Sequence, residues 1–232
     1  MKKKFSKRFK KLLEISSDKN SSKIEDAISK VKKNCTTKFN DYIDVSLLLN
    51  LKQKKDEFNL RTVVKLPNGN GKKIKVAVLC EESKITEAKK SGAELYNSDN
   101  LIKDIASGKI KFDKLIATPS MMTKMGKLGK ILGPKGLMPN PKLGSVTNDL
   151  KKAVTNAKSG QVEIKNDKDG NIGLTIGKKS FSDENLLKNF KAVFDTLERE
   201  KGNITVKGNL VKSVFLTSTM GVSYKIKLDK SI

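Results

Sequence analysis

Residues 126–149, GKLGKILGPKGLMPNPKLGSVTND, combine backbone-shaping and cationic residues in a pattern that suits binding of a polyanion. The stretch holds five glycines, three prolines and no acidic residue before Asp149, together with four lysines, Lys127, Lys130, Lys135 and Lys142. Glycine lets a backbone approach a partner closely and proline fixes φ, so the loop is both shaped and positively charged. A solvated surface loop is the alternative, but unstructured loops of this length are uncommon and the leucines here need a place to pack.

The charge of the whole chain points to the same kind of partner. Its 232 residues include 49 basic and 25 acidic ones, a formal net charge of +24. Nucleic acid is the leading candidate partner and an anionic membrane surface is the second. Only Arg8, Arg61 and Arg199 are arginines, and lysine suits point contacts to phosphate more than bidentate reading of bases. An AT-rich coding sequence would produce the same excess of lysine.

Several enzyme classes are excluded by composition. The chain has no histidine, which removes Ser-His-Asp and Cys-His catalysis and His-ligated metal sites. Cys35 and Cys80 fit no metal-binding spacing and are expected to be ordinary buried thiols. Residues 173–180, GLTIGKKS, lack one of the four residues that a P-loop needs between its glycines, and no GxGxxG is present. We expect no metal, no cofactor and no membrane span, although a nucleotide-dependent enzyme remains the rival from another class.

The outer thirds of the chain are typical of α+β structure. Apolar residues Phe5, Phe9, Leu12 and Leu13 favour a basic first helix, and Ser22 and Glu25 have capping-box spacing for a helix over 22–37. Alternating apolar residues predict a half-buried strand over 43–51. The remaining expected elements are a strand at 61–66, a turn or hinge at 66–71, a hairpin around Lys168-Asp169-Gly170, a helix over 182–202 and strands at 211–219 and 222–228.

The middle third has the pattern of α/β structure. Residues 74–80, IKVAVLC, form a continuous apolar run that is typical of a strand covered on both faces. A helix from Ser98 to Gly108, a strand at 114–118, a helix opened by Pro119 and another ended by Gly160 follow. Strands that alternate with helices predict a parallel sheet, so we expect two domains with junctions near 67–71 and 159–161.

Two short segments of the outer thirds could contact RNA. Residues 213–221, SVFLTSTMG, offer hydroxyl groups beside a Met-Gly turn, which can bond to 2′-hydroxyls and phosphates. A strand with serine and threonine on its solvent face is the simpler explanation. Lys38 and Phe39 could provide a charge and a stacking ring, although a core phenylalanine is the commoner case.

Five sequence blocks resemble the ribosomal protein L-one family, and they follow one another in the order found in that family. Its members form part of the mobile side stalk of the large ribosomal subunit. The blocks are 38–45 (KFNDYIDV), 66–78 (LPNGNGKKIKVAV), 126–149, 156–170 (NAKSGQVEIKNDKDG) and 218–221 (STMG). The resemblance covers nearly the whole chain. It implies a split α+β domain formed by 1–68 and 160–232, and an inserted Rossmann-like three-layer α/β domain at 69–159. The crossings between them would be hinges at Pro67, Gly69, Ser159 and Gly160.

The resemblance also implies a non-enzymatic RNA-binding role as a monomer within the cytoplasmic ribosome, with an organellar ribosome left open. Its partners would be large-subunit ribosomal RNA, transfer RNA in the exit site and its own operon messenger RNA, whose translation it would repress. Carried over by motif, the main RNA-binding residues are Lys38, Phe39, Asp41, Asp167, Lys168, Ser213, Thr219, Met220 and Gly221. Relatives often have glutamate where Asp41 stands. Lys127, Lys130, Lys135 and Lys142 would form a secondary RNA-binding or cleft surface.

Overall fold

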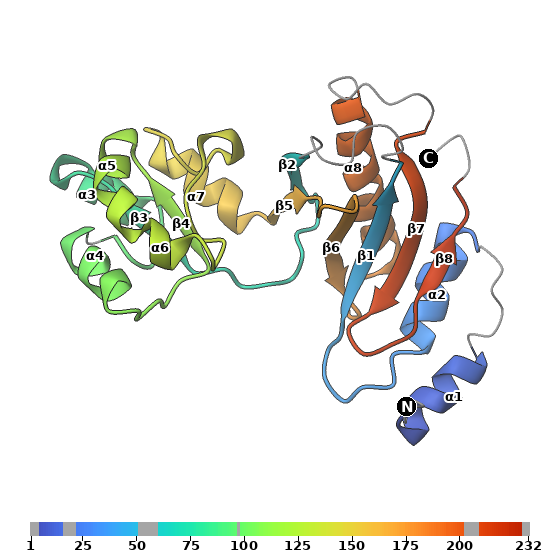
Figure 1. The fold of residues 1–232 in the computed structure, drawn as a ribbon. Coiled ribbons are helices and arrows are strands. Elements are labelled where there is room, and N and C mark those ends of the chain that lie inside the picture. Colours follow the sequence, from blue (N-terminus) through green and yellow to red (C-terminus); the bar gives the residue numbers. More distant parts are fainter. Residues whose placement is uncertain (1–4, 16–21, 51–59, 97, 202–208, 229–232) are drawn as a thin grey trace. The chain divides into compact units, whose positions relative to one another are not determined.

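The chain has a mixed α/β structure, seen in a computed structural model that describes residues 5–15, 22–50, 60–96, 98–201 and 209–228 (Figure 1). It divides into two compact units. The terminal unit contains Met1–Gly71 and Val162–Ile232, so it is built from both ends of the chain. The inserted unit is Lys72–Gln161.

The terminal unit is organised around a four-stranded antiparallel sheet with the order β6-β1-β7-β8. The strands are β1 (Tyr42–Leu49), β6 (Asn171–Lys178), β7 (Val211–Ser218) and β8 (Tyr224–Ile226). The predicted alternation in β1 is confirmed, because Ile43, Val45, Leu47 and Leu49 are all buried on one face. Apolar residues at every second position thus fix which face of the sheet meets the core.

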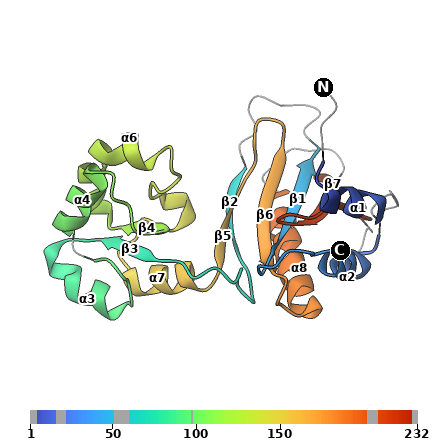
Figure 2. The same cartoon turned by 90° about the horizontal axis from the view of Figure 1, so that it is seen from below.

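Helices α2 (Ile24–Lys33) and α8 (Asp183–Lys201) cover that buried face (Figures 1 and 2). The first helix, α1 (Lys7–Ile15), adds the buried Leu12 and the partly buried Phe9 to the same core. The predicted capping box of α2 is wrong, since the N-cap residue is Lys23 and no side chain caps the helix. Ser22 instead forms a β-bridge with Ile226, and its hydroxyl accepts a hydrogen bond from Lys30.

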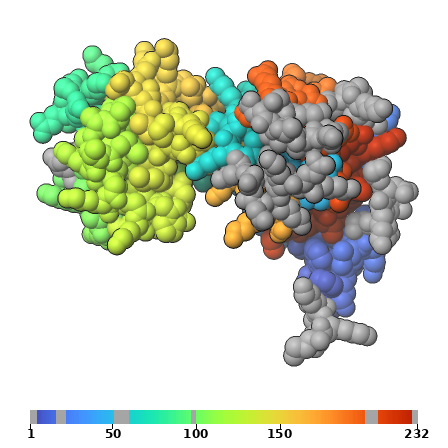
Figure 3. Space-filling model, turned by 45° about the horizontal axis from the view of Figure 1, so that its top comes forward, coloured from blue at the N-terminus to red at the C-terminus, as the bar shows by residue number. Residues whose placement is uncertain are grey.

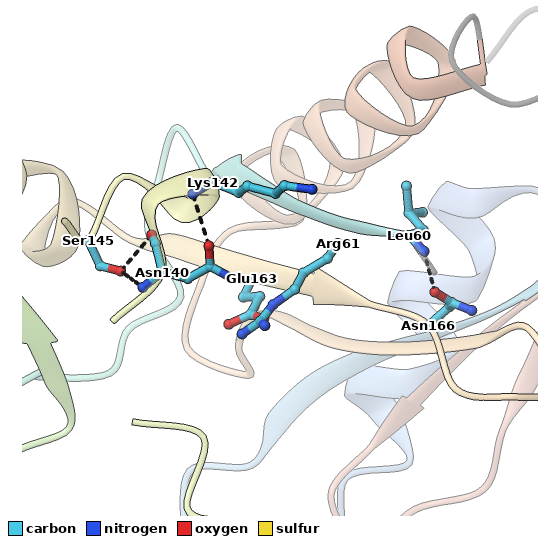
Figure 4. A network of polar contacts seen from close by, with 7 residues as sticks. All are labelled: Leu60, Arg61, Asn140, Lys142, Ser145, Glu163 and Asn166. Carbon is cyan, nitrogen blue, oxygen red and sulfur yellow. Dashed lines mark hydrogen bonds and ion pairs between the residues drawn. The ribbon is translucent and has the colours of Figure 1, made fainter. Parts of the chain in front are cut away.

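Strands β2 (Arg61–Lys65) and β5 (Gln161–Lys165) form a separate two-stranded sheet. The hairpin expected between 161–167 and 171–177 is therefore wrong in its pairing. The predicted turn exists, but β5 and β6 share only the isolated bridge between Asn166 and Ile172. Two polar contacts favour the pairing of β5 with β2. Arg61 and Glu163 form an ion pair of 2.6 Å, and the Leu60 N–H donates to Asn166 Oδ1 at 2.6 Å (Figure 4).

The inserted unit is built on two buried parallel strands, β3 (Val76–Leu79) and β4 (Lys114–Ala117). One apolar cluster joins alternate strand residues to α4 (Ser98–Ala106), α5 (Met122–Met125) and α6 (Gly129–Leu132). A second cluster joins the other strand residues to α3 (Ile85–Lys90) and α7 (Leu150–Lys158). The prediction of a strand covered on both faces is thus confirmed. Short 3-10 turns complete the unit: η1 (Glu82–Lys84), η2 (Pro119–Met121), η3 (Gly126–Leu128) and η4 (Pro141–Leu143).

The first connection between the two units begins near Asn68 and Gly69, and Asn189, a fully buried residue of α8, holds these two residues in place. Its amide nitrogen donates to the carbonyl oxygens of Gly69 at 2.8 Å and Ile176 at 2.7 Å, and its oxygen accepts from the Asn68 N–H at 3.1 Å. Ile176 is the extra residue of a bulge in β6, because Ile43 pairs with Gly177 and the next residue, Asp44, pairs with Thr175. A bulge leaves a residue without a ladder partner, and here the side chain of Asn189 satisfies its carbonyl.

Candidate nucleic-acid interface

Two loops meet at the end of the sheet where β1 begins and β7 ends. Thr219 and Tyr42 join them, because the Tyr42 N–H donates to the Thr219 hydroxyl at 3.0 Å and the Thr219 N–H donates to the Tyr42 carbonyl at 3.1 Å. The loop before β1 contains Lys38 and Phe39, and the turn after β7 contains Met220 and Gly221. Five of the predicted RNA-binding residues are therefore brought together. We call this surface the loop end.

Arg8 ties the same two loops together from the N-terminal helix. Its guanidinium donates to the Thr36 hydroxyl at 3.0 Å and to the Met220 carbonyl at 2.9 Å. A planar guanidinium can hold two acceptors in a fixed geometry, which lysine cannot do. Sequence reasoning missed this residue. The available signal was its rarity, since Arg8 is one of only three arginines in a lysine-rich chain.

The loop end exposes large apolar side chains next to a cation. Phe39 is 55 % exposed and Met220 is 51 % exposed, and the neighbouring Lys38 is also exposed. Phe39 is therefore not a core residue, which removes the commoner explanation for it. Exposed rings beside positive charge are suited to stacking on bases while a lysine contacts phosphate.

Asp41 lies beneath the loop end and not on its surface. Its side chain is fully buried, so the structure does not expose it for the direct contact with RNA that the family resemblance implies. The Cys35 thiol lies beside it, and burial raises the pKa of that thiol, with the Asp41 carboxylate adding to the rise. Close packing extends to Gly221, where a Cβ atom would overlap the hydroxyl of the buried Ser218. The base of the loop end is thus closely packed.

Three predicted residues lie at the opposite end of the sheet. Leu48, near the end of β1, pairs with both Asn171 and Ser213, so Ser213 and the turn of Asp167 and Lys168 are together there. At about 3.3 Å per residue, this second group is roughly 20 Å from Tyr42 along the strand. The predicted site is therefore two groups of residues on one sheet.

Asp167 holds the shape of its own turn. Its carboxylate accepts hydrogen bonds from the Asn171 side chain and from the N–H groups of Asn171 and Asp169. The bond from the Asn171 side chain, followed by those from the backbone, lowers the pKa of Asp167 below its ordinary value. Lys168 at the tip of this turn is exposed.

The 126–149 stretch of the inserted unit is an ordered surface. Leu128 and Leu132 are buried, whereas Lys127, Lys130, Lys135 and Lys142 are exposed and none ion-pairs with a described carboxylate. Asn140 holds the last part, since its backbone N–H donates to the Ser145 hydroxyl at 2.7 Å and its side chain accepts from the Lys142 N–H at 2.9 Å (Figure 4). Figure 3 shows the yellow-green part of the chain, which includes this stretch, spread over the visible face of its unit.

Other kinds of site find little support in the described residues. Residues 173–178 lie within β6, so their backbone is used in the sheet and does not cradle phosphate as a P-loop would. Within the described ranges, no group of three or more Cys, Asp or Glu residues could hold a metal ion. No helix in the part of the chain that the structure describes has the length and apolar character needed to cross a membrane.

Comparison with known proteins identifies the family. Residues 31–222 match the Ribosomal protein L1p/L10e family. The chain is 63 % identical over 227 residues to the large ribosomal subunit protein uL1 of Pelagibacter ubique (strain HTCC1062), covering 98 % of this chain and 99 % of that protein. Proteins of the same name are 48 % identical in Rickettsia bellii (strain OSU 85-389), over 87 % of this chain and 84 % of that one, and 43 % identical in Prochlorococcus marinus (strain NATL1A), over 98 % and 96 %.

A mixed α/β protein with exposed cations, whose relatives are large ribosomal subunit proteins, is a ribosomal protein. The chain belongs to the Ribosomal protein L1p/L10e family, the family that its sequence blocks resemble.

Proposed function

We propose that this non-enzymatic protein binds large-subunit ribosomal RNA at the mobile side stalk through the terminal unit. The observation that carries the proposal is the loop end, where Lys38, Phe39, Thr219 and Met220 are brought together by bonds to Tyr42 and Arg8. Lysine contacts to phosphate supply affinity by releasing counterions, and Phe39 and Met220 supply apolar contact with unstacked bases. Lys168 and Ser213 at the far end of the sheet extend the contact along the RNA.

We propose further that the two units are a split RNA-binding domain and an inserted Rossmann-like domain joined by two hinges. At the first crossing, Asn189 fixes Asn68 and Gly69 to the terminal unit, so the movable backbone begins after Gly69. At the second crossing, Ser159 and Gly160 follow α7, and Gly160 has a φ of 89°, which favours glycine. The lysines of the 126–149 stretch form a secondary RNA-binding surface.

The same RNA-binding chemistry supports two further roles. The protein assists the release of deacylated transfer RNA from the exit site of the cytoplasmic ribosome. It also represses translation by binding its own operon messenger RNA, because a surface that reads RNA shape binds a messenger segment that imitates the ribosomal site.

The test is a binding titration with a side-stalk fragment of large-subunit RNA, compared with an unrelated duplex of equal length. Phe39→Ala and Met220→Ala change exposed side chains, so we expect both variants to keep the fold. We expect each variant to bind about tenfold more weakly, which is near the smallest loss of affinity found when a base loses a stacking contact. Log affinity falls as log salt concentration rises, and Lys38→Ala makes this slope less steep by about 0.7–0.9. Lys89→Ala, an exposed lysine on α3, is the matched control and leaves the affinity unchanged. A salt-independent affinity, or equal affinity of all variants, refutes the proposal.

A further inference from the structure

The sheet of the terminal unit has a second face that no described helix covers. Helices α2 and α8 both lie on the opposite face (Figures 1 and 2). Because side chains alternate along a strand, the residues between the buried ones of β1 and β7 point to the open face. Across three strands, Ser46, Phe215 and Lys225 form one row, since Phe215 pairs with Ser46 on one side and with Lys225 on the other.

Phe215 is a half-buried ring on that face and does not belong to the core. Its neighbours Val214 and Leu216 are buried in the apolar cluster, but Phe215 neither belongs to this cluster nor packs against it among the described residues. Aromatic residues favour strands, and packing against a partner across the strands would be the simple explanation. Here both cross-strand partners are polar, so that explanation is weak.

The charges around Phe215 favour an anionic occupant. Lys225 is exposed and pairs directly with Phe215, whereas Lys178 is farther away on the same face, with its ammonium 5.1 Å from the centre of the Tyr42 ring. Asp44, an acidic group of that face, accepts a hydrogen bond from the Thr175 hydroxyl. A flat ring, a cation and the exposed hydroxyl of Ser46 match a base, its phosphate and its 2′-hydroxyl.

The position of Phe215 connects the two groups of predicted residues. It lies two residues from Ser213 and four residues from Thr219 along β7, or roughly 7 Å and 13 Å. An RNA strand that contacts both ends of the sheet passes over this ring. We propose that an unpaired base of the bound RNA stacks on Phe215 while Lys225 contacts its phosphate, an inference that rests on the proposed RNA-binding function.

The experiment uses the full chain and the side-stalk RNA fragment with 5-iodouridine in place of uridine. Irradiation joins a stacked iodouracil to an aromatic side chain, and mass spectrometry locates the linked peptide. We expect a crosslink at Phe215 in the wild type and none there in Phe215→Leu, which keeps apolar bulk without a ring. Phe215→Leu weakens binding about tenfold, whereas Phe215→Tyr binds like the wild type.

The outcomes separate this inference from the function on which it rests. If the wild type does not bind the RNA, both fail. If the wild type binds and Phe215→Leu matches it, with crosslinks at Phe39 alone, only the stacking inference is overturned. If Phe215→Leu binds RNA normally but enters the large subunit poorly, a protein occupies the face and the inference is again overturned. Unchanged thermal unfolding of Phe215→Leu shows that its weaker binding does not come from misfolding.

Discussion

Replacing Asn189 with alanine tests whether one buried amide holds the crossing to the terminal unit. The change removes both donors to Gly69 and Ile176 and the acceptor for the Asn68 N–H. Ile176 is fully buried, so water cannot replace the lost partner of its carbonyl. Asn68 and Gly69 are only partly buried and can bond to water.

The cost follows from these different burials. An unsatisfied buried carbonyl costs about 1–3 kcal/mol, and an exchange of a protein bond for a water bond costs about 0.5 kcal/mol for each of the other two groups. We therefore expect a loss of about 2–4 kcal/mol in the free energy of unfolding. For a chain of this size, that corresponds to a decrease of roughly 5–15 °C in Tm.

The assay is thermal and urea unfolding followed by circular dichroism. Lys188→Ala, an exposed change one residue earlier on α8, is the control and shifts stability by less than about 0.5 kcal/mol. Asn189→Asp keeps an acceptor for the Asn68 N–H but faces two carbonyls with a carboxylate, so it is also destabilising. If Asn189→Ala were as stable as Lys188→Ala, the amide would not hold the crossing and the reasoning would be refuted.

Three other outcomes follow from the described contacts. Gly221→Ala destabilises the protein by about 1–3 kcal/mol through overlap with the Ser218 hydroxyl, and adding Ser218→Ala restores much of the loss in a double-mutant cycle. Burial would raise the pKa of Glu94, but hydrogen bonds from Lys158 and the Val76 N–H outweigh this effect and lower that pKa. Above the ordinary pKa of 4.5, Glu94→Gln is therefore less stable than the wild type. In urea-unfolding measurements, this difference in stability disappears as the pH is lowered. Burial raises the pKa of both thiols, so alkylation of native Cys35 and Cys80 at pH 8 is slow and becomes fast in urea, a contrast that exposed thiols would not show.

Helices and strands with a strong periodic pattern were predictable from the sequence, but which strands pair with each other was less predictable. The alternation of β1 and the apolar run of β3 were sufficient because burial on one or both faces leaves a direct mark on residue type. The pairing of β5 with β2 instead of β6 was missed because it depends on Arg61–Glu163 and Asn166, contacts between residues about 100 positions apart. Long-range polar contacts leave no local pattern.

The candidate interface was predictable only where a motif carries it. Phe39, Met220 and Gly221 lie on the two loops that the Tyr42–Thr219 bonds join, whereas Asp41, which was carried over from the same family motif, is buried beside a thiol. Arg8 was missed because its two acceptors, Thr36 and the Met220 carbonyl, are 28 and 212 residues away. Sequence motifs identify residues that meet a partner more readily than residues that hold them in place.

The pairing of β1 with β6 and β7 has a consequence for synthesis. Leu48 pairs with Asn171, 123 residues later, so at about 5–20 residues per second β1 waits roughly 6–25 s for its first neighbour. The inserted unit is complete by then and can fold first. Thr219 bonds to Tyr42, 177 residues earlier in the chain, only after both residues have left the ribosome that makes them. Chains that stop before Thr219 cannot form the loop end, so binding through that surface excludes such truncated chains.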